Sequence, residues 1–459
     1  TLKKPTIAPI RPPWVYIIPE HIWGSSSCHD INTAKFFTDG QPMVGSGPFQ
    51  LTGWDKGQNW TMTANPDYWG GAPHIDQFIV KKFSNAEDLV TALKTGTIDY
   101  SQSISVRLFD QLAKENGANG ITTHIGPETT FDQMSFNMCD PTAAYTSTYC
   151  KSTGSTGNPA LRDPVVRQAI SWAIDRKTLV DKVLAGYGSP GTTVVPPFAT
   201  TFHYDPPADQ QYGFDINKAN AMLDAAGYKD TDGDGIRNMK GGGANLDFRL
   251  ILRSDSDISA DLGQYISGWL SQIGIATKKS VLTDGKLEQA WLANDYDMYI
   301  WGWGPDPDPD FILSTFTSGQ CGSWSDTCFS NKQYDQLYLA QQTAKTPEDR
   351  IKIVDQMQGI LYQQVPEMVL MYDNSLEAYN SNKWTGLEDN ISPQPEGSLW
   401  NQYTPYTALT IRPVGSGGSS SSGGISPIVW IGAIAIVGIG AAGFIASSKR
   451  RAKNEDDLA

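Results

Sequence analysis

Two tryptophans and three aspartates lie close together in the stretch YIWGWGPDPDPDF. Trp301 and Trp303 are followed by Asp306, Asp308 and Asp310, and a proline separates each aspartate from the next. Proline fixes φ and removes a backbone donor, so we predict a rigid, bent, acidic loop at the end of a buried strand. A carboxylate in such a loop can bind a ligand ammonium, while indole faces pack on apolar or cationic parts of the ligand. The alternative is a surface turn whose acidic side chains are solvated.

The composition limits the class of protein. The chain has 459 residues, of which 18% are charged and 39% hydrophobic, and its formal net charge is -14. This length is too great for one core, so two or more lobes are expected. A nucleic-acid-binding protein needs a basic footprint, so no nucleic acid is expected as a partner. The chain opens at Thr1 without a signal segment, and we expect N-terminal sequence to be missing.

The five cysteines predict two local disulfides. Cys139 and Cys150, and likewise Cys321 and Cys328, bracket short loops of small and polar residues, and no CxxC pair indicates zinc. Disulfides in turn indicate an oxidising compartment. Cys28 is left over, and its partner is expected in the missing N-terminal part.

The C-terminal end predicts a membrane anchor. Residues 413–424 form a Gly/Ser linker, residues 425–446 are apolar and uncharged, and residues 447–459 form a basic tail. An apolar run of this length is enough to span a bilayer. By the positive-inside rule, the tail is expected in the cytoplasm and the large N-terminal part outside, as a single-pass protein of the cell membrane.

A short acidic motif raises the question of calcium. Asp230, Asp232 and Asp234 in DTDGDG match the first half of a calcium-binding loop. The twelfth position is Gly241, which has no carboxylate. Calcium is the only cofactor that the sequence suggests. Because of the mismatch at the twelfth position, a plain acidic turn is the alternative.

Helical and strand patterns alternate along the chain, which predicts a mixture of α and β. Asn85 is expected to begin one helix. Asp163 is expected to cap a second helix with Pro164 in its first turn, and Asp175 to cap a third. The run MVLMY, residues 368–372, has the continuous apolar character of a buried strand.

Several long motifs in a fixed order resemble one family. VGSGPFQL, NPDYWGGAPHID, LRDPVVRQAISWAIDRKTLVDKVLAGYGSP, AGYKDTDGDGIRN, YIWGWGPDPDPDF and PEMVLMYDNSLEAYNSNKWTGL follow one another between about residues 45 and 387. Together they resemble the extracellular solute-binding proteins of the peptide and nickel type (family 5), which serve ATP-driven importers.

The resemblance implies a fold and a site. The fold would be α/β and two-lobed, of the periplasmic-binding-protein type (class II) with a hinge. Its expected parts are a partial first lobe (1–130), a second lobe (131–370) and a segment returning to the first lobe (371–412). In relatives that bind peptides, an aspartate after the GW motif holds the α-ammonium, and Asp306 occupies that position. Trp301 and Trp303 would flank the ligand or merely pack in the core, and Gly304 is expected to belong to the same ligand-binding site. Arg253 matches an arginine that binds the peptide carboxylate in some relatives, and a solvated surface arginine is the alternative.

The expected function is therefore capture of short peptides and their delivery to a membrane-embedded ABC permease. No HExxH, GxSxG or phosphate-binding loop is found, so the protein is not expected to be an enzyme. Alternatives are a membrane-anchored secreted hydrolase, a sensor that signals through a partner, and a receptor of the same fold for sugars or nickel complexes.

Overall fold

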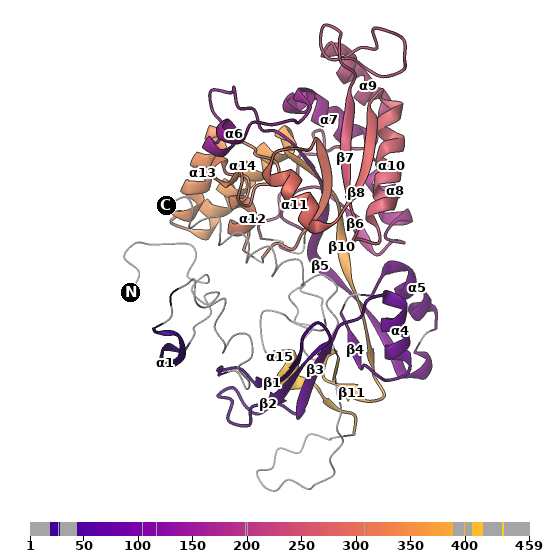
Figure 1. The fold of residues 1–459 in the computed structure, drawn as a ribbon, viewed down its shortest axis with the longest axis vertical. Coiled ribbons are helices and arrows are strands. Elements are labelled where there is room, and N and C mark those ends of the chain that lie inside the picture. Colours follow the sequence, from indigo (N-terminus) through magenta and orange to yellow (C-terminus); the bar gives the residue numbers. More distant parts are fainter. Residues whose placement is uncertain are drawn as a thin grey trace. The chain divides into compact units, whose positions relative to one another are not determined.

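A computed structural model gives the fold (Figure 1). It describes residues 19–25, 27, 44–102, 104–115, 117–197, 199, 201–306, 308–388, 399, 406–415 and 434–435. These residues divide into two compact units. The first unit holds Thr129–Asn374, and the second is made of the described residues before and after that stretch.

The first unit is built on a mixed sheet. Its strands are β5 (Ile121–Phe136), β6 (Gly188–Pro190), β7 (Asp247–Arg253), β8 (Ala276–Leu282), β9 (Met298–Trp303) and β10 (Glu367–Asn380). The strand order is β10-β5-β9-β7-β8, and β6 pairs with β10. Strand β7 is parallel to β8 and β9, whereas β5 is antiparallel to β9. The carboxyl ends of β7, β8 and β9 therefore share one edge of the sheet.

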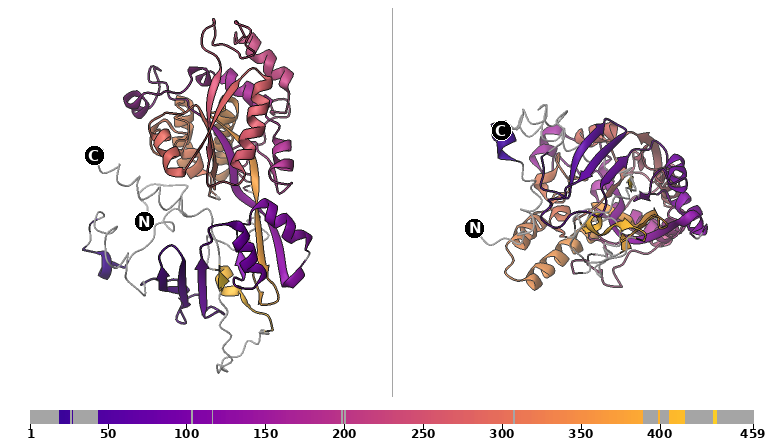
Figure 2. Two further views of the ribbon diagram at one scale, coloured as in Figure 1. Left: turned by 45° about the vertical axis from the view of Figure 1, so that its right-hand side comes forward. Right: turned by 90° about the horizontal axis from the view of Figure 1, so that it is seen from below.

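Helices cover both faces of this sheet (Figures 1 and 2). Gly263 of α10 (Ser259–Gln272) lies so close to Leu252 of β7 that a Cβ there would be 2.6 Å from the leucine side chain. The neighbouring residue Ile251 packs instead with Leu287 and Trp291 of α11 (Asp284–Leu292). Because successive strand residues point to opposite faces, α10 and α11 lie on opposite sides of β7.

Predicted caps explain where several helices begin. Asp163 accepts a hydrogen bond from Val165 N, with Pro164 in the first turn of α7 (Pro164–Ala173). Asp175 caps α8 (Arg176–Lys182) in the same way. The other helices of the first unit are α6 (Thr148–Thr153), η3 (Pro159–Arg162), α9 (Ile216–Ala225), α12 (Asp310–Ser314), η4 (Ser318–Gln320), α13 (Lys332–Gln342) and α14 (Pro347–Gln364).

The second unit combines small sheets with short helices. Strands β1 (Phe49–Asp55), β2 (Asn59–Ala64) and β3 (Gln77–Lys81) are antiparallel, and β4 (Tyr100–Ser101) pairs with the later part of β10. Strands β11 (Trp384–Thr385) and β12 (Arg412–Pro413) pair with each other. The helices are α1 (Glu20–Trp23), α4 (Ala86–Lys94), α5 (Val106–Lys114), η2 (Ala118–Gly120) and α15 (Tyr406–Thr410). Asn85 caps α4, as predicted.

The prediction of a C-terminal membrane-spanning helix is wrong. Within the described residues, no helix is both long enough and apolar enough to cross a bilayer. Of the segment 425–446, only β13 (Ile434–Ala435) is described, and it pairs in parallel with β3. An apolar composition is compatible with a strand as well as a helix, which is why length and hydropathy misled. The single-pass membrane localisation and the bilayer contact rested on that helix and are corrected with it. The linker (413–424) lies mostly, and the tail (447–459) entirely, outside the described residues.

Both predicted disulfides are confirmed. The Cα atoms are 5.6 Å apart in Cys139–Cys150 and 4.5 Å apart in Cys321–Cys328. The four buried cysteines pack into one cluster together with Tyr149. Cys28 lies outside the described residues.

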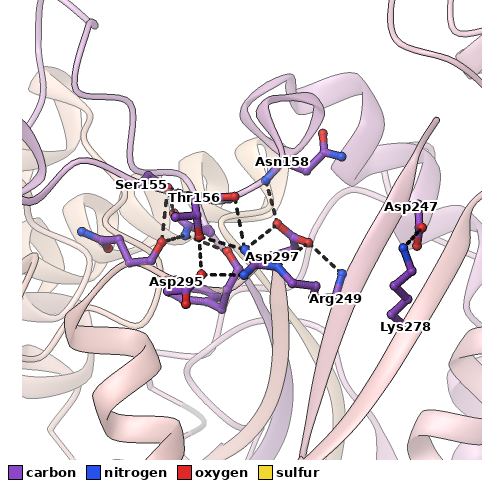
Figure 3. Close-up of polar contacts among 12 residues, drawn as sticks. Ser155, Thr156, Asn158, Asp247, Arg249, Lys278, Asp295 and Asp297 are labelled. Carbon is purple, nitrogen blue, oxygen red and sulfur yellow. Dashed lines mark hydrogen bonds and ion pairs between the residues drawn. The ribbon is translucent and has the colours of Figure 1, made fainter. Parts of the chain in front are cut away.

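A polar network fixes the loop that precedes α7 (Figure 3). The Arg249 guanidinium lies 2.6 Å from Asp295 Oδ1 and 3.1 Å from Asp297 Oδ2. It also donates to Thr156 O at 3.2 Å, and the backbone N–H of Asn158 donates to Asp297 Oδ1 at 2.7 Å. The two acids precede β9, so this network lies at the amino end of that strand and secures the fold.

Candidate functional site

The carboxyl ends of β7 and β9 bring several sequence-predicted residues together. In open α/β sheets, ligands bind outside the carboxyl ends of the parallel strands. Arg253 is the last residue of β7, and Trp301 and Trp303 lie among the last three residues of β9, directly before the acidic loop. All of them belong to the first unit.

Arg253 and Trp301 contact each other directly. The guanidinium carbon lies 4.2 Å from the centroid of the indole ring, within cation–π range. The same guanidinium forms a fork with Asp255, at 3.0 Å and 2.6 Å, and lies 3.7 Å from Asp284. In this structure the guanidinium of Arg253 is paired with Asp255 and its side chain is 22% exposed, so it is not a fully solvated surface arginine.

Asp132 is an acid of this site that the sequence did not reveal. It lies half-buried on β5 opposite Gly302, where an added Cβ would come within 3.3 Å of Asp132 Oδ1. Burial raises the pKa of Asp132 to about 6, although Arg253 and a hydrogen bond with Asp373 act in the opposite direction. The only sequence signal was a single aspartate inside an otherwise strand-like run, and its neighbours became visible only through strand pairing.

Trp303 is held in place by a second unforeseen acid. Its indole N–H donates to Asp326 Oδ2 at 2.6 Å, and the side chain is 7% exposed. The ring packs near Phe311 and Trp324, with centroids 6.1 Å and 6.4 Å away. Trp303 therefore packs mainly against its protein neighbours, and little of its surface is exposed to a ligand.

The acidic loop is anchored by two of its three aspartates. Asp308 forms a bidentate pair with Arg350 of α14, both contacts being 2.6 Å. Asp310 accepts a hydrogen bond from Gln341 of α13 at 2.5 Å, and Arg350 also donates to Gln341 at 3.0 Å. This arrangement supports the predicted rigid loop over a merely solvated turn.

The two remaining positions of the predicted site lie in the same loop. Asp306 is half-buried, and Gly304 is exposed. A Cβ at Gly304 would lie 3.3 Å from Thr130 Cγ2, so a larger residue would need the neighbouring strand to adjust. The ligand-binding roles of Asp306, Gly304, Trp301, Trp303 and Arg253 remain predictions.

The acidic motif gives no support for calcium. Asp230, Asp232 and Asp234 are exposed, and their oxygens lie within 4.8 Å of one another. Across the described chain this is the one group of three or more metal-ligating side chains. The backbone N–H groups of Gly233 and Gly235 hydrogen-bond to Asp230 and lower its pKa, so its carboxylate already serves the turn.

The fold and this acidic, aromatic edge define a two-lobed α/β binding protein. The chain belongs to the bacterial extracellular solute-binding proteins, family 5: the family description, "Bacterial extracellular solute-binding proteins, family 5 Middle", matches residues 1–324. This confirms the resemblance and agrees with the prediction of a binding protein and not an enzyme, since the family is one of solute-binding proteins.

Individual relatives are distant. The chain is 27% identical over 373 residues to "Oligopeptide-binding protein AppA" of Bacillus subtilis, covering 80% of this chain and 63% of that protein. It is 26% identical over 411 residues to "Protein XP55" of Streptomyces lividans, covering 89% of this chain and 66% of that protein. The chain thus spans about two thirds of the length of these relatives.

Solved structures share the fold. AppA of Bacillus subtilis in complex with a nonapeptide superposes with a TM-score of 0.68 at 24% identity, covering 87% of this chain and 72% of that one. NikZ of Campylobacter jejuni in complex with Ni(L-His) superposes with a TM-score of 0.72 at 21% identity, covering 90% and 76%.

Proposed function

We propose that this protein captures short peptides outside the cytoplasm and delivers them to an ATP-driven importer. One observation supports a ligand with a positive end. Around the single guanidinium of Arg253, at the carboxyl end of the sheet, lie the carboxyl groups of Asp132, Asp255 and Asp284. Asp306 adds a further acid on the loop after β9. A peptide's free amino group matches this excess of negative charge.

The family gives the proposal its second support. Relatives named for binding oligopeptides, glutathione and D,D-dipeptides share 24–27% of aligned residues with this chain. Peptides offer a common chemistry, because their backbone groups can pair as an added strand whatever the side chains are. In the proposal, Asp306 holds the α-ammonium and Trp301 packs on the first residue.

The test compares the affinities of wild type and Asp306→Asn for peptides of about two to five residues. Each peptide is prepared with a free and with an acetylated amino end. Asp306→Asn is expected to weaken binding of free peptides by about 2–5 kcal/mol, because a desolvated ammonium loses its partner. Acetylated peptides lack that ammonium and are expected to bind wild type and variant equally weakly. Isothermal titration calorimetry measures both arms.

Asp209→Asn is the control, since Asp209 is exposed and belongs to the same unit. Equal affinity of wild type and Asp306→Asn for free peptides would refute the role of Asp306. Binding of a nickel–histidine complex or an oligosaccharide in place of every peptide would assign a different solute. Turnover of a peptide would make the protein a hydrolase.

A further inference from the structure

A closed loop contacts the indole of Trp303. The Cys321–Cys328 disulfide closes this loop, and residues 325–327 within it accept hydrogen bonds from three separate parts of the first unit. Trp291 Nε1 donates to Ser325 O at 2.8 Å. Tyr296 and Tyr299 donate to Asp326 O at 2.7 Å and 3.1 Å, and Met138 N donates to Thr327 O at 2.9 Å.

These contacts place the carboxylate of Asp326 against two buried donors. Asp326 Oδ2 accepts from Trp303 Nε1 at 2.6 Å and from Gln133 Nε2 at 3.2 Å. Trp303 is 7% exposed and Gln133 is fully buried. A hydrogen bond from a neutral donor to an ionised carboxylate is stronger than a neutral one, and low exposure strengthens it further.

The orientation of Trp303 matters because the acidic loop leaves the sheet at this residue. Residues 304–309 connect Trp303 to α12, and Phe311 at the start of α12 packs back near the Trp303 ring. Trp324, from the disulfide loop itself, packs against Phe311 with centroids 5.2 Å apart. Both ends of the segment that carries Asp306 therefore rest on rings that the disulfide loop contacts.

We propose that Asp326 is a positioning residue for the solute site. It fixes the Trp303 indole and, through that ring, the loop that carries Asp306, while the Cys321–Cys328 disulfide fixes Asp326. The effect on solute binding rests on the proposed function, whereas the effect on the indole does not. The competing explanation is that Asp326 only secures its own loop, in which case its removal acts independently of Trp303.

The first measurement needs no solute. In protein labelled with ¹⁵N at the indole nitrogens, the Trp303 signal is the one missing from Trp303→Phe. Asp326→Ala is expected to shift this signal upfield and to speed its exchange with solvent, because the N–H loses its acceptor. Asp326→Asn retains an oxygen acceptor and is expected to cause a smaller change. An unchanged Trp303 signal in Asp326→Ala overturns the proposal.

The second measurement uses tri-alanine and tetra-alanine with free amino ends as probes. Asp326→Ala is expected to weaken binding by about tenfold or more, the loss typical of a hydrogen bond to a charged group. Added to Trp303→Phe, which lacks the N–H, it is expected to cause no further loss. Losses that multiply in the double variant overturn the proposal, since Asp326 would then act without Trp303.

Asp335→Ala is the matched control. Asp335 likewise accepts from an aromatic side chain, the hydroxyl of Tyr145, and from Ser318 N, but it lies on α13, and these two partners belong to other parts of the unit than Trp303. This variant is expected to leave both the Trp303 signal and the probe affinity unchanged. If wild type binds no peptide, the proposed function is wrong, and the indole signal alone decides whether Asp326 positions Trp303.

Discussion

Asp132 shows how a single carboxyl group changes its behaviour with its surroundings. An aspartate in water is ionised at neutral pH, but burial raises the pKa of Asp132 to about 6. Its charged neighbours are Arg253 on β7, Asp257 after β7 and Asp373 on β10, and only the first favours its ionised form through charge. An acid with a raised pKa stabilises the folded state most when it is protonated, at low pH, and this contribution is lost as pH rises through about 6.

Asp132→Asn should therefore make the stability of the folded protein less dependent on pH. The amide mimics the protonated acid, so the variant is expected to be only slightly more stable than wild type at about pH 4, near the pKa of the unfolded aspartate, and clearly more stable at about pH 7.5. Thermal unfolding of both proteins at the two pH values measures the difference, in which other titrating groups cancel. A difference in melting temperature that does not depend on pH would contradict the raised pKa.

At the scale of elements, the acidic loop after β9 depends on helices far away in the sequence. The Arg350 side chain is 8% exposed and holds Asp308 by two contacts, while Gln341 joins Arg350 to Asp310. The loop's shape is thus set by α13 and α14 as much as by its own prolines. The sequence revealed the prolines, but not these partners, which lie more than 30 residues away.

Arg350→Ala is expected to lower the free energy of unfolding by about 2–3 kcal/mol, because Asp308 and Gln341 lose charged hydrogen bonds. Urea unfolding measures this loss. Lys177→Ala, which breaks the exposed Lys177–Asp181 pair, serves as a control and should lower the free energy of unfolding much less, because solvent screens a surface pair. Similar losses in the two variants would show that the Arg350 cluster adds no more than a surface pair.

The two disulfides differ in what they hold, although both close short loops. The chain-entropy model gives each bond about 2–3 kcal/mol of stability. Replacing Cys321 and Cys328 by serine should lower stability by this amount and also weaken peptide binding, because Asp326 lies inside that loop. Replacing Cys139 and Cys150 should lower stability alone. Equal binding by both double variants, measured by calorimetry, would contradict this distinction.

At the scale of the whole molecule, the sequence predicted what depends on long or local patterns. The ordered motifs led to the correct family and to a two-lobed α/β fold. The cysteine spacing predicted both disulfides, and Asn85, Asp163 and Asp175 marked true helix starts. These features depend on a few neighbouring residues or on many residues together.

What the sequence did not predict depends on distant residues meeting. The pairing of Arg350 with Asp308 joins a helix to the acidic loop. Asp132 lies opposite Gly302 on a different strand, and the hydrogen bond from Trp303 to Asp326 joins a strand to the disulfide loop. Strand order and register decide such contacts, and neither can be read from local patterns. The prediction of a membrane helix was wrong because it used a local pattern alone, and hydropathy does not distinguish a helix from a strand.

All the residues assigned to the candidate site, from Asp132 to Asp373, lie in one uninterrupted stretch of chain that belongs to the first unit. The two ends of that stretch fall inside strands β5 and β10, not in loops. Under the proposed function, this single stretch would act as a cassette that carries the solute preference. A chimera that exchanges this cassette with a relative's should carry the preference with it, provided that the register of both cut strands is kept.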